Sequence, residues 1–265
     1  MGIKRKTTKV PIEPFHLNQY SPGSLQLPDV EDIWGTPDKE SWNASYLIWK
    51  NHGYTNDGNL IVGYLDLEQK SIKDGKCELA FYEKRVHNGG KENIIEGSLI
   101  TDATAFYKPL QWELSSKFIS ANGEVIPSLN FHQKTTVEDK QIIYLNNGKE
   151  VVADKKNELF HEFGLIRYFF DPAFATDKVG SFTFLENGLI VKPGHQITEA
   201  TELNQELNER NFTCFLQIGY GINPIEYYVD ENHLLCAAIS CFSAKIYNSN
   251  AADYYNDFIS KSFKN

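Results

Sequence analysis

Short runs of alternating apolar and polar residues follow one another from Trp42 to the end of the chain. Typical runs are "ASYLIWK" (44–50), "CELAFYEKRV" (77–86), "LQWELSSKFI" (110–119) and "IEYYVD" (225–230). Corners rich in Gly, Asn and Asp separate them, among them Asp74-Gly75 and Asn147-Gly148. Period-two alternation indicates half-buried strands, and Asn-Gly or Asp-Gly corners favour tight hairpin turns. We therefore predict a strongly curved antiparallel meander, a half-barrel or barrel, of about ten to twelve strands.

Helical spacing stands out in "NELFHEFGLIRYFF" (157–170). The apolar residues at i, i+4, i+7 and i+11 are Leu159, Phe163, Ile166 and Phe170, which form one continuous stripe. We predict an amphipathic helix over 156–170, capped by Asp154 or Asn157 and ended by Asp171-Pro172, that packs on the concave side of the sheet. A second helix is predicted at the C-terminus after Ser249-Asn250.

The stretch "GYGINP" (219–224) raises the question of a phosphate-binding glycine loop. A dinucleotide fingerprint needs a third glycine and a following helix. Here Pro224 follows, and the next segment is rich in β-forming residues. The stretch therefore predicts a turn between two strands, because glycine gives backbone freedom and proline opens a strand.

The first 40 residues differ from the rest of the chain. Five prolines recur in this segment, which is irregular for that reason, yet Tyr20 and Trp34 are among several large apolar residues within it. We interpret residues 1–40 as an arm packed on a single mainly-β domain that spans 41–265. A division into two domains near residue 155 is the alternative.

The acidic composition limits the classes of partner that the protein can bind. The formal net charge is −9, which argues against non-specific binding to nucleic acid. No apolar stretch is as long as a membrane span, roughly 18–20 residues. The N-terminus carries basic residues without an apolar segment behind them. We expect either a periplasmic or secreted protein whose leader is absent, or a cytoplasmic protein.

Cysteine and histidine positions indicate neither a metal site nor a cofactor. Cys77, Cys214, Cys236 and Cys241 show no metal-ligand spacing. Cys236 and Cys241 point to opposite faces if they share a regular strand, so they cannot pair. Buried free thiols are expected, and a disulfide between distant cysteines stays open. We expect no bound metal and no cofactor.

Three residues are candidates for acid–base chemistry. His132 lies within a predicted strand, and Glu226 and Tyr228 share one face of a later strand. A His, a Tyr and a carboxylate supply both a proton acceptor and a proton donor near neutral pH. If the protein has a functional centre, we expect it on the concave face, built from the strands that carry these three residues. The simpler interpretation is that the three are unrelated surface or packing residues.

Tryptophans are candidates for ligand contacts. Trp42 and Trp49 lie close together in the sequence, and Trp112 stands alone in a predicted strand. Aromatic side chains line carbohydrate and lipid clefts, but in β-domains most of them pack in the core. Ligand contact and core packing are both consistent with the positions of these tryptophans.

Several segments of the C-terminal half resemble a group of exported bacterial β-rich proteins of uncharacterised function. The matching segments are Phe182–Ile197, Leu216–Leu235 and the helix "LFHEFGLIRYFF". Those proteins resemble the half-barrels of periplasmic lipoprotein carriers, in which a meandering sheet wraps around a helix. The resemblance implies this fold and an exported location, and it implies no site residues.

Three functions fit these observations. The first is an extracytoplasmic binding protein that holds a small apolar or carbohydrate ligand on the concave face. The second is a carbohydrate-active lyase or hydrolase that uses the His/Tyr/carboxylate set. The third is a structural or assembly subunit with an acidic surface. The oligomeric state does not follow from the sequence.

Overall fold

The fold is described from a computed structural model, over residues 16–20, 41–52, 55–87, 89–103, 106–171, 173–186, 188, 190–207 and 209–262. Most of the predicted arm 1–40, including Trp34, lies outside the described residues. Within it, Leu17–Gln19 forms the 3-10 helix η1. Leu17 and Tyr20 are buried, and Tyr20 stacks edge-on against Trp49 with ring centroids 5.5 Å apart. This part of the arm packs on the sheet.

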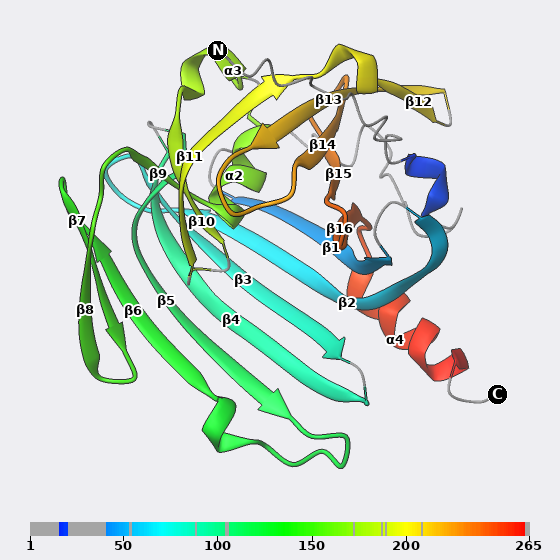
Figure 1. Cartoon of the computed structure of the whole chain (residues 1–265), viewed down its shortest axis with the longest axis horizontal. Helices are drawn as coiled ribbons and strands as arrows, with labels where there is room; N and C mark the ends of the chain where they lie inside the picture. The colour runs from blue at the N-terminus through cyan, green and yellow to red at the C-terminus, as the bar shows by residue number, and fades with distance from the viewer. Residues whose placement is uncertain are drawn as a thin grey trace, which may run out of the picture.

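Sixteen strands form a single sheet in the described part of the chain (Figure 1). The first eight are β1 (Ser41–His52), β2 (Thr55–Ser71), β3 (Lys76–His87), β4 (Lys91–Asp102), β5 (Lys108–Ile119), β6 (Phe131–Val137), β7 (Gln141–Asn146) and β8 (Lys149–Asp154). The others are β9 (Glu158–His161), β10 (Phe182–Glu186), β11 (Ile190–Glu199), β12 (Gln205–Leu207), β13 (Arg210–Ile218), β14 (Ile225–Asp230), β15 (Leu235–Ile239) and β16 (Ser243–Tyr247). The helices are α2 (Glu162–Phe169), α3 (Thr176–Val179), α4 (Ala251–Ser262), η2 (Pro127–Leu129) and η3 (Thr201–Leu203).

The strand order explains the curvature. It runs β8-β7-β6-β5-β4-β3-β2-β1-β16-β15-β14-β13-β11-β10-β9, with β12 paired to β13 beside this path. The two ends of the order, β8 and β9, are consecutive in the chain and are joined only by residues 155–157. So short a connection spans at most roughly 14 Å. The sheet must therefore curl until its ends come close, although no pairing joins β8 to β9 among the described residues.

The prediction of a strongly curved meander is confirmed, with more strands than predicted. Neighbouring strands are antiparallel except β9 and β10, which pair in parallel. The predicted corners are present: Asn147 and Gly148 both have positive φ, as a type I′ turn requires, and so do Asp74 and Gly75. The Gly219–Pro224 stretch connects β13 to β14, so it is a turn between strands and not a phosphate loop.

The central helix is shorter than predicted. Residues 158–161 form strand β9, and α2 begins only at Glu162. The cap is neither Asp154 nor Asn157 but His161, whose Nδ1 accepts a hydrogen bond from the Phe163 N–H at 3.2 Å. Pairing with β10 decides this boundary. Residues 158–161 make backbone hydrogen bonds to β10, and a helix that began earlier would break this pairing. The predicted end of the helix before Asp171 is correct.

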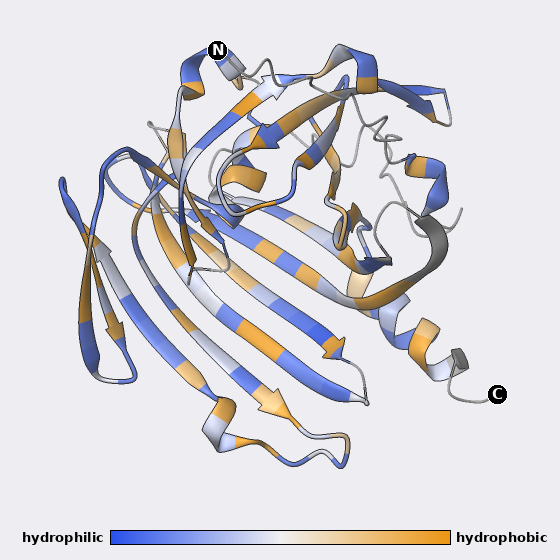
Figure 2. Ribbon diagram, in the orientation of Figure 1, coloured by the Kyte–Doolittle hydropathy of each residue, from blue (hydrophilic) through white to orange (hydrophobic). Residues whose placement is uncertain are grey.

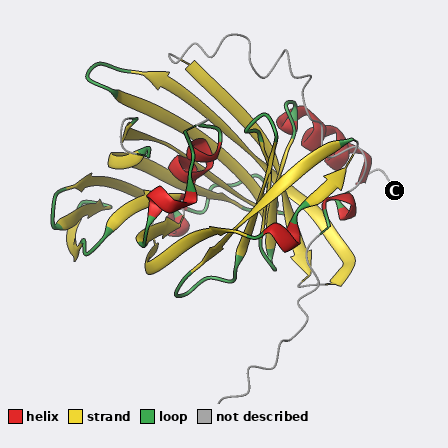
Figure 3. Ribbon diagram, turned by 90° about the horizontal axis from the view of Figure 1, so that it is seen from above, coloured by secondary structure: helices red, strands yellow, loops and turns green. Residues whose placement is uncertain are grey.

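The sheet has an inner face around α2 and an outer face. On β14 Tyr227 points inward and stacks on Phe169 of α2, with ring centroids 4.5 Å apart. On β2 Tyr64 points outward and contacts Tyr255 of α4 at 5.7 Å. Figure 3 shows the strands wrapping around short helices while the longer C-terminal helix lies outside. The C-terminal helix is thus present at the predicted residues, and it lies on the outer face.

Alternation along the strands builds the core. Figure 2 shows apolar and polar residues alternating along the long strands. On β3 the inward residues Leu79 and Phe81 are buried, and on β4 and β5 their counterparts are Leu99 and Trp112. All four cysteines are free and buried, as predicted. The period-two pattern thus determines which side chains lie on the inner face of the sheet and which lie on the outer face.

Candidate functional site

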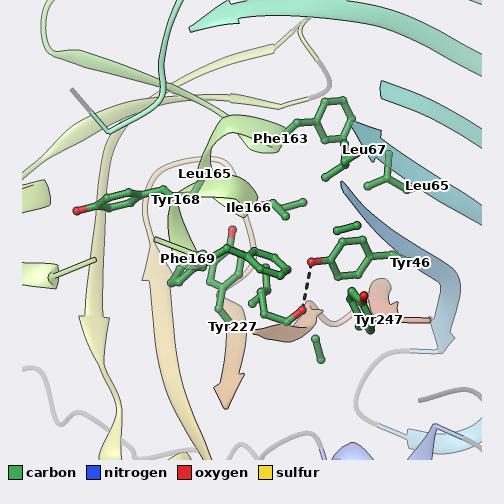
Figure 4. Packing of buried hydrophobic residues seen from close by; sticks show 14 of the residues in the cluster. Tyr46, Leu65, Leu67, Phe163, Leu165, Ile166, Tyr168, Phe169, Tyr227 and Tyr247 are labelled. Carbon is green, nitrogen blue, oxygen red and sulfur yellow. Dashed lines mark hydrogen bonds between the residues drawn. The ribbon is translucent and has the colours of Figure 1, made fainter. Parts of the chain in front are cut away.

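The space around α2 is filled by aromatic side chains. Figure 4 shows Phe169 of α2 beside Tyr227, Ile166 on the side of Tyr46, and Phe163 directed towards Leu67 of β2. Tyr46 Oη donates a hydrogen bond to the Leu235 carbonyl at 3.1 Å, so even this hydroxyl is satisfied. This part of the interior is a closely packed core.

A cavity of about 120 Å³ lies next to this core, between α2 and the strands of the concave face. Its lining residues are Arg85, Glu162, Ile166, Glu186, Ile225, Tyr227, Ala238, Ser240, Ser243 and Lys245. Ile166 and Tyr227 come from the core described above, whereas four of the other residues are charged. We call this space the charged cavity.

Three ion pairs surround the charged cavity. Arg85 Nε donates to Glu83 Oε1 at 2.6 Å, and Lys192 Nζ donates to Glu186 Oε2 at 2.6 Å. Lys245 Nζ is paired with Glu162 Oε1 at the first residue of α2. Three carboxylates and three cations therefore balance one another at this place.

Local sequence explains how each strand delivers its charge. Leu79, Phe81, Glu83 and Arg85 follow one another on the inner face of β3, so the face changes from apolar to charged along the strand. Lys245 is paired in register with Ile48 of β1, which is fully buried, and so takes an inward position on β16. The alternation that builds the core therefore also directs these charges inward.

Neighbouring charges favour the ionised forms of Glu162 and Arg85. Burial opposes the charge on Glu162, but Lys245 and then Arg85 hold its pKa below the usual value. Burial likewise opposes the charge on Arg85, whereas Glu83, Glu162 and Glu186 together raise the pKa of its guanidinium. Because Glu162 and Glu186 both act on Arg85, the three ion pairs form one electrostatic unit.

A hydrogen-bonded chain fixes the wall opposite α2. Tyr227 Oη donates to Gln217 Oε1 at 2.7 Å. Gln217 Nε2 lies 2.8 Å from His195 Nδ1, and His195 Nε2 lies 3.2 Å from the Tyr220 carbonyl. The carbonyl can only accept, so His195 carries its proton on Nε2 and accepts at Nδ1. Burial raises the pKa of Tyr227, which is therefore a neutral, rigid wall residue.

His161, the residue before Glu162, has aromatic surroundings. Its ring centroid is 5.2 Å from that of Phe163 and 5.9 Å from that of Trp112. Its Nε2 is buried and has no hydrogen-bond partner, while Nδ1 caps α2. Burial lowers the pKa of His161 to about 4, so the ring is neutral at pH 7.

The predicted catalytic set is not brought together. His132 lies on the outer face of β6, where its Nε2 contacts Glu113 Oε1 at 2.9 Å. Its neighbour Gln133 points inward and accepts a hydrogen bond from Trp112 Nε1 at 2.8 Å. The side chain of His132 is 46% exposed, so the residue belongs to a solvated surface. The expectation that it lies on the concave face is wrong.

Glu226 and Tyr228 lie together, but also on the outer face. Tyr228 Oη donates to Glu226 Oε2 at 2.6 Å and accepts from Gln205 Nε2 at 2.8 Å. Gln205 Oε1 accepts from the Leu17 N–H at 3.0 Å, so η1 covers this cluster. Burial, and then Glu226, raises the pKa of Tyr228. The location of the two residues corrects the prediction that they face the concavity, because Tyr227 takes that direction.

The three candidate tryptophans have three different surroundings. Trp112 is an inward core residue and Trp49 is buried on the outer face against Tyr20. Trp42 is partly buried, with the Arg167 guanidinium 5.2 Å from its ring centroid. None of the three lines the charged cavity. The side-chain environments are those of packing residues, and a ligand role for them stays a prediction.

A second hollow, of about 300 Å³, lies on the outer face of β3–β6. Glu113 and Lys134 belong to its lining and pair with each other at 3.0 Å. Their side chains are 50% and 56% exposed, so water competes for both of them. The hollow is therefore less suited to hold a ligand than the charged cavity.

The sequence pattern does not single out Arg85, Glu162, Glu186 or Lys245 as site residues. The available signal was a charge at an inward position: Glu83 and Arg85 continue the face of Leu79 and Phe81. Within the described residues no group of three or more His, Cys, Asp or Glu could hold a metal ion. No helix among them is long and apolar enough to cross a membrane.

The fold and the cavity define a class: an open, strongly curved β-sheet wrapped around a helix, with a small charged cavity on its concave side. No protein-family model and no curated protein matches the chain. A β-barrel-like protein from Brucella abortus, containing the domain of unknown function DUF1849, has a similar crystal structure with a TM-score of 0.52. Its sequence is 11% identical, and the match covers 79% of this chain and 96% of that chain. The likeness supports the barrel-like β-rich fold.

Proposed function

We propose that this protein is a binding protein that holds a small polar ligand in the charged cavity. The observation that carries the proposal is the cavity of about 120 Å³, which has Arg85, Glu162, Glu186 and Lys245 in its wall. It lies on the concave face, where the sequence predicts a ligand. The apolar ligand that the sequence also allows is not part of the proposal, because aromatic side chains fill the space around α2.

The charges themselves support a functional role. Buried ion pairs seldom add stability, because removing the charges from water costs about as much as their attraction returns. The Lys245–Glu162 pair is of this kind, with side chains 11% and 13% exposed, and the other two pairs are partly buried. Apolar residues of similar size would fit beside the aromatic core. Three ion pairs gathered around one cavity are therefore better explained by recognition of a polar molecule.

The setting of the protein belongs to the same proposal. We place it outside the cytoplasm, on the resemblance to exported bacterial β-rich proteins. The likeness to lipoprotein carriers supports only the general plan of a sheet wrapped around a helix. Fractionation of the native host, with detection of the protein in periplasm, medium and cytoplasm, would test this; a purely cytoplasmic protein would contradict it.

Ligand screening tests the binding function. A panel of neutral sugars, sugar acids, amino acids and short carboxylates would be added to the pure protein, with the melting temperature and then calorimetric titration as readouts. We expect at least one compound to bind, and binding to be lost in Glu162→Gln, which keeps the shape and removes the charge.

Glu113→Gln is the matched control, because Glu113 is half exposed on the outer face. It should bind the same compound as tightly as the unaltered protein. The proposal is wrong if no compound binds, or if Glu162→Gln and Glu113→Gln bind equally well.

The enzymatic alternative gains no support from the arrangement of its residues. His132 is on one outer surface and the Glu226–Tyr228 pair lies under η1 on another part of the sheet. Proton transfer to or from a substrate needs the groups within hydrogen-bond reach of the same molecule.

A further inference from the structure

Arg85 is held in place by one edge of its guanidinium. Its Nε donates to Glu83 Oε1 at 2.6 Å, and the Glu83 side chain is only 2% exposed. No hydrogen bond joins the two terminal Arg85 nitrogens to another described residue, although the side chain lines the charged cavity and is 25% exposed. The guanidinium is thus fixed with two donors directed away from Glu83.

Two parallel donors on a rigid planar group match the two oxygens of a carboxylate. Arginine binds carboxylates in this bidentate way, and its orientation by a buried partner reduces the entropy lost on binding. Glu83 therefore acts as a positioning residue for Arg85.

The surrounding charges demand a second feature of the ligand. Three carboxylates and three cations already balance, and Glu162 and Glu186 both act electrostatically on Arg85. A ligand carrying only a carboxylate would add an uncompensated negative charge beside these two. A ligand that also carries an ammonium group leaves the net charge of the site unchanged. Its ammonium group is attracted by the carboxylates of Glu162 and Glu186.

The volume limits the size of the ligand. A cavity of about 150 Å³ accommodates benzene, which has about six non-hydrogen atoms. The charged cavity, at about 120 Å³, is slightly smaller. Glycine and alanine are molecules of this size.

We propose that the ligand is a small zwitterion of the α-amino acid class, an inference that rests on the proposed binding function. Its carboxylate binds the terminal nitrogens of Arg85, and its ammonium group lies towards Glu162 and Glu186. The aliphatic part of the ligand meets Ile166, Ile225 and Ala238, the apolar residues of the lining.

Calorimetric titration with three matched probes tests the inference on the unaltered protein. The probes are L-alanine, propionate, which lacks the ammonium group, and ethylamine, which lacks the carboxylate. We expect alanine to bind at least about tenfold more tightly than either of the other two, because each lacks one charge-assisted contact. Equal affinity for alanine and propionate would overturn the zwitterion.

Arg85→Lys adds a test of the anchor. Lysine keeps the charge but loses the planar fork, so alanine affinity should fall about tenfold or more. Lys84→Ala is the matched control, since Lys84 precedes Arg85 on the same strand and pairs with Glu92 at 2.9 Å on the outer face. It should leave alanine binding unchanged. Unaltered alanine binding in a folded Arg85→Lys variant would overturn the assignment of Arg85.

The two proposals fail in distinguishable ways. If alanine does not bind but a sugar or another polar compound binds with dependence on Glu162, the zwitterion is wrong and the binding function stands. If nothing in the wider panel binds, both are wrong. Should Arg85→Lys fail to fold, the three-probe comparison still decides the class of ligand.

Discussion

The first residue of α2 and the aromatic residues that follow it have opposite kinds of surroundings. Phe163 and Phe169 meet aromatic rings from β3 and β14. Glu162, at the N-terminus of the helix, pairs with Lys245 of β16 and lies at the charged cavity. The aromatic contacts close the interior and supply stability. The charged N-terminus costs desolvation and lies at an open space, so residues that build the fold and residues available for recognition are neighbours on one short helix.

Removing an aromatic ring should have the largest effect. Phe163 is 2% exposed and its ring centroid lies 4.6 Å from that of Phe81. Phe163→Ala should lower the free energy of unfolding by roughly 3–5 kcal/mol, because a cavity forms in a packed core. Urea denaturation measures this. A loss below about 1 kcal/mol would show that this side of α2 does not carry the stability assigned to it.

Breaking one buried ion pair should cause the second largest loss of stability, whereas replacing both partners with apolar residues should cause a much smaller loss. Lys245→Met leaves Glu162 buried without its main partner and should cost about 3 kcal/mol. The double variant Lys245→Met with Glu162→Leu should regain most of that loss, since it removes both charges. Denaturation of the three proteins checks the comparison. A double variant less stable than the single one would mean that the charges serve stability after all.

Acid should weaken the folded protein through His161. The unfolded histidine takes up its proton near pH 6.5, whereas in the fold burial lowers the pKa to about 4. Between these values the unfolded chain binds more protons, so stability is lost as the pH falls from about 6.5 towards 4. The loss due to this residue should reach about 2–3 kcal/mol.

His161→Asn provides the comparison for the pH profile, because asparagine also caps a helix and does not titrate. The difference between the two unfolding free energies, measured from pH 7 to pH 4, isolates the histidine from all other groups. If the two profiles run parallel, His161 does not titrate as described.

The smallest effect is expected on the outer face. His132 and Glu113 are about half exposed and their contact is open to water. His132→Ala should change the unfolding free energy by less than about 0.5 kcal/mol and leave ligand binding unaltered. Loss of binding at an unchanged melting temperature would instead place the site on the outer face, where His132 lies.

The strands, the turns and the aromatic character of the interior follow from local patterns in the sequence. Alternation in "CELAFYEKRV" specifies which residues of β3 share a face, and positive φ is supplied by the Asn-Gly and Asp-Gly corners where it is needed. These are local properties, since they depend on neighbours along the chain and on the backbone preferences of single residues. The buried stripe of Leu159, Phe163, Ile166 and Phe170 is predicted for the same reason.

Which face is concave, and which charges meet, depends on contacts between residues far apart in the chain. Alternation separates Tyr227 from Tyr228 but does not say which one points at α2. Pairing of residues 158–161 with β10 turned a predicted first turn of helix into a strand. Residues 155–157 then bring the two ends of the sheet close together. The curl of the whole sheet also brings together the four charged residues of the cavity, Arg85, Glu162, Glu186 and Lys245. Their distances in space depend on this curl and not on their spacing along the chain.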